Sequence, residues 1–144
     1  LLSWFDQTNG PVLVLLSGGA SAVVESLLPG VDEGTYSTEV QRLLMSGAPI
    51  HELNAFRRSV SALKGGRAAE RLGDRLSSVW VVSDVLDDDL RTIGSGMFYL
   101  PETASRHHIV SSALIELPHL AGVVQDAGYE VESIGLFSNP DHLQ

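Results

Sequence analysis

The feature that most constrains this fold is an unbroken apolar run that ends in two glycines. Val12–Leu16 holds five consecutive apolar residues, and Ser17-Gly18-Gly19 follows directly. A run without polar alternation predicts a strand that is buried on both faces, as in the middle of a parallel sheet. The residues that come next, up to Leu28, predict a helix. Strand, glycine turn and helix in this order indicate a βα unit.

The glycine turn is a candidate anion site. In a strand–turn–helix unit, backbone N–H groups stay free at the carboxyl end of the strand, where they and the helix dipole attract a phosphate or carboxylate. The spacing of Gly18 and Gly19 matches neither the dinucleotide-binding pattern nor the P-loop. The alternative is a tight turn in which only glycine fits. The spacing by itself leaves both interpretations open.

Hydrophobic spacing along the rest of the chain predicts alternating helices and strands. Apolar residues at three- and four-residue steps predict one helix that ends near Gly47 and further helices at residues 50–64, 68–72 and 117–127. Pro118 is expected in the first turn of the last helix. Apolar or alternating runs predict further strands at residues 79–82, 108–110 and 129–136. This order predicts one α/β domain over residues 1–144, a three-layer α/β/α sandwich with a mainly parallel, Rossmann-like sheet.

The composition argues against several classes of binding partner. The chain has 9 Lys and Arg against 18 Asp and Glu, a formal net charge of −9, which argues against general nucleic-acid binding. No apolar run approaches the ~20 residues of a membrane span, and no signal peptide is visible at the start. The lack of cysteine excludes disulfides and thiolate sites. We therefore expect a cytoplasmic protein that binds neither nucleic acid nor membrane.

Polar residues that could bind a ligand also follow a second predicted strand. Ser83 and Asp84 come directly after the strand predicted at 79–82, and Asp88 follows shortly. Ligands of open α/β sheets bind beyond the carboxyl ends of the strands. An acidic strand end beside an anion-binding turn suits Mg²⁺-dependent phosphoryl transfer, because the cation bridges carboxylate and phosphate oxygens. The alternative is a solvated turn that caps a short helix.

A basic stripe is the third candidate feature. Asn54, Arg57, Ser61 and Lys64 are spaced by three or four residues, which predicts that they share one face of a helix. Basic residues on a helix usually face water, and that is the alternative interpretation. The glycines between Lys64 and Arg67 favour ligand binding, because a backbone can approach a ligand there. On either interpretation, replacing Lys64 by alanine is expected to change stability very little.

These stretches together resemble the glycerate 2-kinase family that carries a C-terminal MOFRL domain, some members of which are labelled hydroxypyruvate reductases. The matching motifs, in chain order, are Ser17-Gly18-Gly19-Ala20-Ser21, Ser46-Gly47-Ala48, His51-Glu52-Leu53-Asn54, Arg57-Arg58, Ser61, Lys64-Gly65-Gly66-Arg67, Ser83-Asp84-Val85, Asp88-Asp89 and Ser95-Gly96. The chain departs from the family pattern at Ala20, which replaces a glycine, at Leu86-Asp87, which replaces Pro-Gly, and at Met97-Phe98, which replaces Pro-Thr.

The resemblance implies phosphorylation of D-glycerate to 2-phosphoglycerate, with ATP and Mg²⁺. It implies that Lys64, Asp84 and Arg57 are catalytic and that Asp84 and Asp88 hold the metal. The implied substrate- or phosphate-binding residues are Ser17, Gly18, Gly19, Ser21, Asn54, Arg67 and Ser95.

The resemblance also implies that this chain is a portion of the N-terminal domain of a two-domain kinase. It would pack against the second domain across the active site and be inactive alone; a homodimer is left open. The alternatives are a sugar-phosphate-binding α/β module without kinase activity and a catalytically inactive assembly domain.

Overall fold

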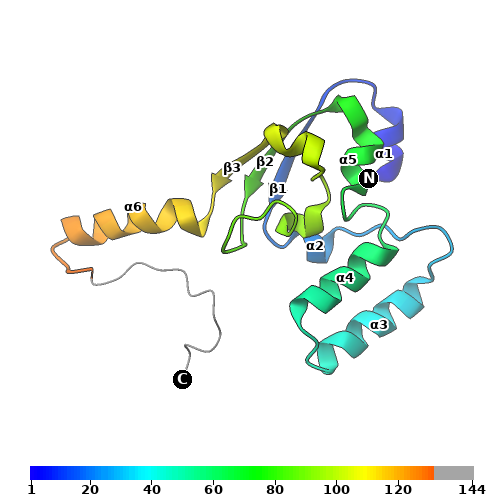
Figure 1. Cartoon of the computed structure of the whole chain (residues 1–144), viewed down its shortest axis with the longest axis horizontal. Helices are drawn as coiled ribbons and strands as arrows, with labels where there is room; N and C mark the ends of the chain where they lie inside the picture. Colours follow the sequence, from blue (N-terminus) through cyan, green and yellow to red (C-terminus); the bar gives the residue numbers. More distant parts are fainter. Residues whose placement is uncertain (132–144) are drawn as a thin grey trace.

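The computed structural model describes residues 1–131 and shows a three-stranded sheet whose strands are connected by helical segments (Figure 1). The strands are β1 (Val12–Ser17), β2 (Leu76–Val82) and β3 (His107–Ser111), which lie in this order and pair in parallel. The helical elements are α1 (Leu2–Gln7), α2 (Ala20–Val23), α3 (Glu33–Met45), α4 (Ile50–Val60), α5 (Arg67–Leu72), η1 (Gly73–Arg75), η2 (Ile93–Gly96), η3 (Pro101–Arg106) and α6 (Ala113–Asp126). The predicted α/β class and parallel sheet are confirmed.

The strand expected at residues 129–136 lies mostly outside the described residues, and residues 129–131 are not in a strand. None of the helices in residues 1–131 combines the length and the apolarity that a membrane crossing requires.

The hydrophobic core lies on one face of the sheet. Val12 and Leu16 of β1, with Val79 and Val81 of β2, are buried there. The core residues that cover them come from α1, the turn before α5, α5 itself and the segment after β2: Phe5, Leu63, Ala68, Ala69, Leu72, Ile93, Met97 and Phe98. Alternate residues of a strand point to opposite faces, so burial follows a period of two along β1 and again from Val79 to Val81 in β2, after the register shift that follows Leu76.

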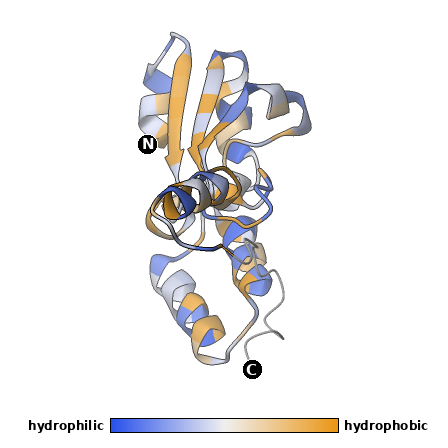
Figure 2. Ribbon diagram, turned by 90° about the vertical axis from the view of Figure 1, so that its left-hand side faces the viewer, coloured by the Kyte–Doolittle hydropathy of each residue, from blue (hydrophilic) through white to orange (hydrophobic). Residues whose placement is uncertain are grey.

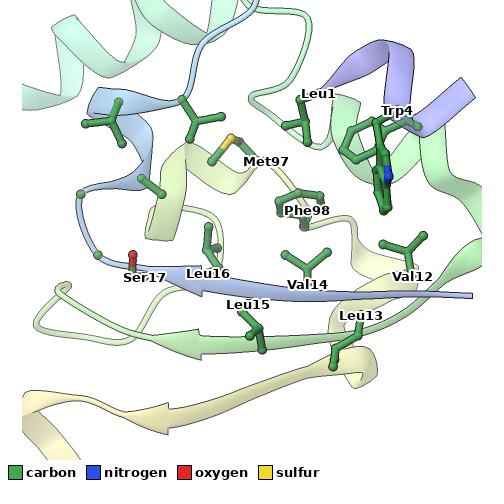
Figure 3. A pocket seen from close by; sticks show the side chains of 16 residues that line it. Leu1, Trp4, Val12, Leu13, Val14, Leu15, Leu16, Ser17, Met97 and Phe98 are labelled. Carbon is green, nitrogen blue, oxygen red and sulfur yellow. The ribbon is translucent and has the colours of Figure 1, made fainter. Parts of the chain in front are cut away.

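The opposite face of the sheet is apolar and uncovered in the described residues. Leu15 is 75% exposed, and the other large apolar side chains exposed on the strands are Leu13, Trp80, Val82 and Val110. Figure 3 shows Leu13 and Leu15 on the side of β1 away from Met97 and Phe98. The prediction that β1 is buried on both faces is therefore wrong for residues 1–131, where β1 is an edge strand with one helical layer.

Helices α3 and α4 form a hairpin that stands away from the sheet (Figures 1 and 2). Asp32 caps the N-terminus of α3: its carboxylate accepts a hydrogen bond from the Thr35 N–H at 2.7 Å. The two segments that carry the hairpin, residues 26–28 and 60–62, pair with each other: the Leu28 N–H donates to Val60 O at 2.9 Å and the Ala62 N–H to Ser26 O at 2.7 Å. We call these paired segments the neck.

The neck explains two wrong predictions. The helix expected up to Leu28 ends at Val23, because the residues after Glu25 are extended and pair with the neck's second segment. The helix expected to reach Lys64 ends at Val60, because Ser61 is extended and its Oγ accepts hydrogen bonds from the N–H groups of the two residues after Ala62.

The last helix also begins earlier than predicted. Ser112 caps α6 at its N-terminus, so Pro118 lies inside the helix and not in its first turn. A proline at that place has no N–H to donate to the carbonyl four residues earlier. The apolar spacing, which begins at Leu117, therefore missed about one turn of helix at the start of α6.

Candidate functional site

The glycine turn and Asp84 meet at neighbouring strand ends. Ser17 of β1 pairs with Val82 of β2, which brings the two polar segments to one edge of the sheet. The Gly19 N–H donates to Asp84 Oδ2 at 2.9 Å. A Cβ on Gly18 would lie 2.6 Å from both Cβ and Cγ of Asp84, so only glycine lets the carboxylate approach this closely. The predicted proximity of these two strand ends is confirmed.

Two residues in the segment after β2 combine a positive φ with a buried side-chain oxygen that has no hydrogen-bond partner within residues 1–131. Asp88 and Ser95 are the non-glycine residues with positive φ in residues 1–131, at 52° and 56°. Asp88 Oδ1 and Ser95 Oγ are also buried without a hydrogen-bond partner within that part of the chain. Strained backbone and unsatisfied polar atoms both cost free energy and concentrate at functional sites. These two oxygens are the best-supported ligand groups beyond the glycine turn.

Two of the predicted motifs pack directly on each other. The Gly65 N–H donates to Ser95 O at 3.0 Å, and the Gly66 N–H donates to Gly96 O at 2.7 Å. Gly66 has a φ of 86°, and a Cβ there would lie 2.5 Å from Leu100 Cδ2. The glycine pair is therefore required for this backbone contact, and it holds Ser95 in place.

Lys64 lies in this turn and not on a helix. Its side chain is 0% exposed, and its Nζ donates to Glu25 Oε2 at 2.5 Å and to Val24 O at 3.0 Å. The prediction of one helical stripe from Asn54 to Lys64 is wrong, because α4 ends before Ser61. A direct contact of Lys64 with substrate would require breaking the ion pair with Glu25.

Glu25 is the residue that the sequence analysis missed. It is the one charged residue between Asp6 and Asp32, and it lies just after the small residues of the glycine turn. An isolated ionisable residue inside a long uncharged stretch is the signal that could have identified it, because a buried charge needs a partner. Spacing alone could not show that this partner is Lys64.

Arg67 is directed at the backbone. Its Nη1 donates to three carbonyl oxygens, those of Arg58 at 2.5 Å, Ser61 at 2.9 Å and Lys64 at 3.2 Å. These carbonyls belong to the end of α4 and the turn that follows. The guanidinium therefore stabilises the turn that carries Lys64, which is a structural role that the sequence did not indicate.

Asn54 and Arg57 are carried by the hairpin. Both lie on α4 and both are partly buried, whereas the glycine turn, Asp84 and Ser95 belong to the sheet body. Arg57 Nε is buried without a hydrogen-bond partner in the described part of the chain. The candidate site is thus divided between two parts that the neck connects.

An apolar groove of about 510 Å³ runs along β1 beside the glycine turn (Figure 3). Val14, Leu16, Met97 and Phe98 line it, and Ser17 with the two glycines lies at one end. Small-molecule sites commonly combine an apolar wall with a few polar groups. A ligand held at the turn would therefore have an apolar surface to lie against.

The carboxylates of the site are oxygen ligands of the kind that Mg²⁺ takes. Within residues 1–131, no group of three or more His, Asp or Glu side chains is arranged to hold a metal ion. Mg²⁺ is usually held by one or two carboxylates, with water and substrate phosphates as its other ligands. Asp84 and the unsatisfied Asp88 Oδ1 are compatible with that mode.

Comparison with known proteins identifies the family. The family model described as "Domain of unknown function (DUF4147)" matches residues 3–123. The chain belongs to this family. Its match to the D-glycerate 2-kinase of Thermotoga maritima is 46% identical over 98 residues, which is 67% of this chain and 24% of that protein. The match to the glycerate 2-kinase of Pyrococcus horikoshii is 39% identical over 90 residues, 62% of this chain and 20% of that protein.

A solved structure supports the same relationship. The crystal structure of the glycerate kinase of Thermotoga maritima superposes with a TM-score of 0.60 at 36% identity, covering 92% of this DUF4147 chain and 30% of that chain. The resemblance expected from the motifs is therefore confirmed. The chain spans about a quarter of the length of the curated relatives it matches.

Proposed function

We propose that this chain is part of an ATP-dependent glycerate 2-kinase. In the proposed reaction, the 2-hydroxyl oxygen of D-glycerate bonds to the γ-phosphorus of ATP, the bond to the ADP oxygen breaks, and the hydroxyl proton is released. The meeting of the glycine turn with Asp84 is the observation that carries the proposal. It places backbone donors and a carboxylate together at the carboxyl edge of the sheet, in a chain whose relatives are named glycerate kinases.

The proposed roles combine this geometry with those that the family resemblance implies. Ser17, Gly18, Gly19, Ser21 and Ser95 would hold phosphate or carboxylate oxygens, and Asn54 with Arg57 would neutralise their charge. Asp84 and Asp88 would hold Mg²⁺, which when bound bridges phosphate oxygens. Lys64 and Arg67, which contact Glu25 and backbone carbonyls, would act by supporting this arrangement.

Because the matched segment is only 24% of the length of the Thermotoga maritima relative, we propose that the 144 residues form part of the larger N-terminal domain of a two-domain kinase and are inactive alone. Glycerate-dependent ADP release should be absent from the isolated chain and present in the protein from the full reading frame. Release from the isolated chain at the full-length rate would contradict this division of the site.

The test of the proposed function is a coupled ADP-release assay on the full-length protein with D-glycerate and Mg²⁺. Asp84→Asn should lower kcat/KM by roughly 100-fold, because a preorganised charge in such a site is worth several kcal/mol. Asp126→Asn, at the end of α6, is the matched control and should retain activity. A wild-type protein without glycerate-dependent ADP release would reject the kinase assignment.

A second candidate, an inactive assembly domain, is favoured by the uncovered apolar face of the sheet. Contiguous exposed apolar surface commonly marks an interaction site. This candidate predicts a stable complex formed through Leu15 and Trp80 together with no binding of phosphate, ATP or glycerate. Binding of any of these ligands at the glycine turn would favour the kinase instead.

A further inference from the structure

The ion pair between Glu25 and Lys64 lies where the hairpin joins the sheet. Lys64 is fully enclosed, and its ammonium group meets the Glu25 carboxylate at 2.5 Å, while the side chain of Glu25 is 19% exposed. An enclosed ammonium group is stable only when it is paired and hydrogen-bonded. Glu25 therefore supplies the carboxylate partner that the enclosed Lys64 side chain needs.

The same carboxylate contacts the hairpin. The Tyr36 hydroxyl of α3 donates to Glu25 Oε2 at 3.3 Å. The Tyr36 ring stacks on Phe56 of α4, with ring centroids 6.0 Å apart and an interplanar angle of 18°. Burial and the neighbouring Glu25 charge raise the pKa of Tyr36, so its hydroxyl keeps the proton that it donates. Glu25 thus joins the turn of Lys64 to both helices of the hairpin.

The neck lies directly beside this network. Glu25 precedes the first neck segment, and Lys64 follows the second after one intervening residue. The hairpin projects from the sheet, and the chain enters and leaves it through the neck (Figure 1). The orientation of α4, and with it that of Asn54 and Arg57, therefore depends on how firmly the neck is held.

We propose that Glu25 is a positioning residue that orients the α3–α4 hairpin, and so Asn54 and Arg57, through its contacts with Lys64 and Tyr36. The inference rests on the proposed function in assigning a substrate to those two side chains. It assigns no contact between Glu25 and substrate. Loss of Glu25 would loosen the neck and weaken glycerate binding without altering the glycine turn itself.

The test uses the full-length protein and two independent measurements. Hydrogen exchange at the neck amides of Leu28 and Ala62 reports the order of the neck without any substrate, and the KM for D-glycerate reports the site. Glu25→Gln should raise neck exchange by about 10-fold relative to β2 amides and should raise KM by a similar factor. Unchanged neck exchange in Glu25→Gln would overturn the proposal.

A double variant separates positioning from simple stability. Glu25→Leu with Lys64→Met replaces the pair by apolar side chains, which commonly restores stability in such sites. We expect an unfolding midpoint near the wild-type value, while neck exchange and KM stay raised because the contact with Tyr36 is lost. Return of both measurements to wild-type values would show that the pair acts only through stability, which would overturn the inference.

Tyr36→Phe tests the positioning role of Glu25 even if the variants at Glu25 and Lys64 do not fold. It keeps the stacked ring and removes only the hydroxyl, so neck exchange should rise about threefold with little change in the unfolding midpoint. Tyr129→Phe, at an exposed site after α6, is the matched control. Equal hydrogen-exchange rates at the neck amides of Tyr36→Phe and Tyr129→Phe would overturn the positioning role of Glu25. A wild-type protein that is inactive on glycerate would reject only the proposed function.

Discussion

The carboxylate of Asp84 accepts a hydrogen bond from the Gly19 N–H at 2.9 Å, between residues 65 positions apart in the chain. The backbone donor that the sequence predicts for a bound anion is thus already used by a carboxylate of the protein. The contact also explains Gly18, where any side chain would collide with Asp84. The glycine turn and the acidic strand end therefore form one structural unit.

We expect Gly18→Ala to destabilise the protein by roughly 1–3 kcal/mol, because the new Cβ must displace the Asp84 side chain. Gly10→Ala is the control: a Cβ there meets nothing within 4 Å, and its effect should stay within about 0.5 kcal/mol. Urea unfolding of both variants measures the difference. Equal stability of the two variants would contradict the close packing of Asp84 on the turn.

Removal of Asp84 should strengthen anion binding at the turn. Asp84→Ala frees the Gly19 N–H and removes a like charge, so inorganic phosphate should bind at least about 10-fold more tightly in the absence of divalent cations. Calorimetric titration of the variant, the wild type and Asp126→Ala measures this effect. Phosphate affinity that is the same in all three proteins would remove the turn as an anion site.

Lys64→Ala should be strongly destabilising, in contrast to the expectation from sequence. The substitution leaves a cavity and an uncompensated Glu25 carboxylate, a change that typically costs ~3–5 kcal/mol. Arg71→Ala breaks the exposed ion pair with Asp6 and should cost no more than about 1 kcal/mol. Thermal and urea unfolding compare the two. A Lys64→Ala protein as stable as Arg71→Ala would show that the ion pair is not enclosed in solution.

His107 should make stability depend on pH. Burial lowers the pKa of His107 below its ordinary value of 6.5, although its ring also hydrogen-bonds to Thr103 O at 3.0 Å. The unfolded chain therefore binds the proton more readily, and the free energy of unfolding should fall as the pH drops through about 6.5 toward the lower pKa of the folded state. His107→Gln should reduce this fall between about pH 7.5 and 5.5 relative to the wild type. An identical fall in His107→Gln and the wild type would contradict the assignment of the pH dependence to His107.

The sequence by itself determined the class of the fold and the members of its motifs. The apolar run of β1 and the glycines after it predicted a strand and a turn correctly, because backbone preference and hydrophobic spacing are local properties. The position of Asp84 directly after β2 was enough to place it near the turn, since parallel strands bring their carboxyl ends to the same edge. The motif order was enough to indicate the family.

Tertiary structure alone decided which polar groups are paired and which are free. The pairing across the neck ended α4 at Val60, which moved Lys64 from an expected helix surface into contact with Glu25. Ion pairs between residues 39 positions apart leave no periodic signal, because the folded path of the chain sets their distance. Only that path shows that Lys64 contacts Glu25 and that Arg67 contacts backbone carbonyls, while Asp88 Oδ1 and Ser95 Oγ are buried without a partner in the described part of the chain.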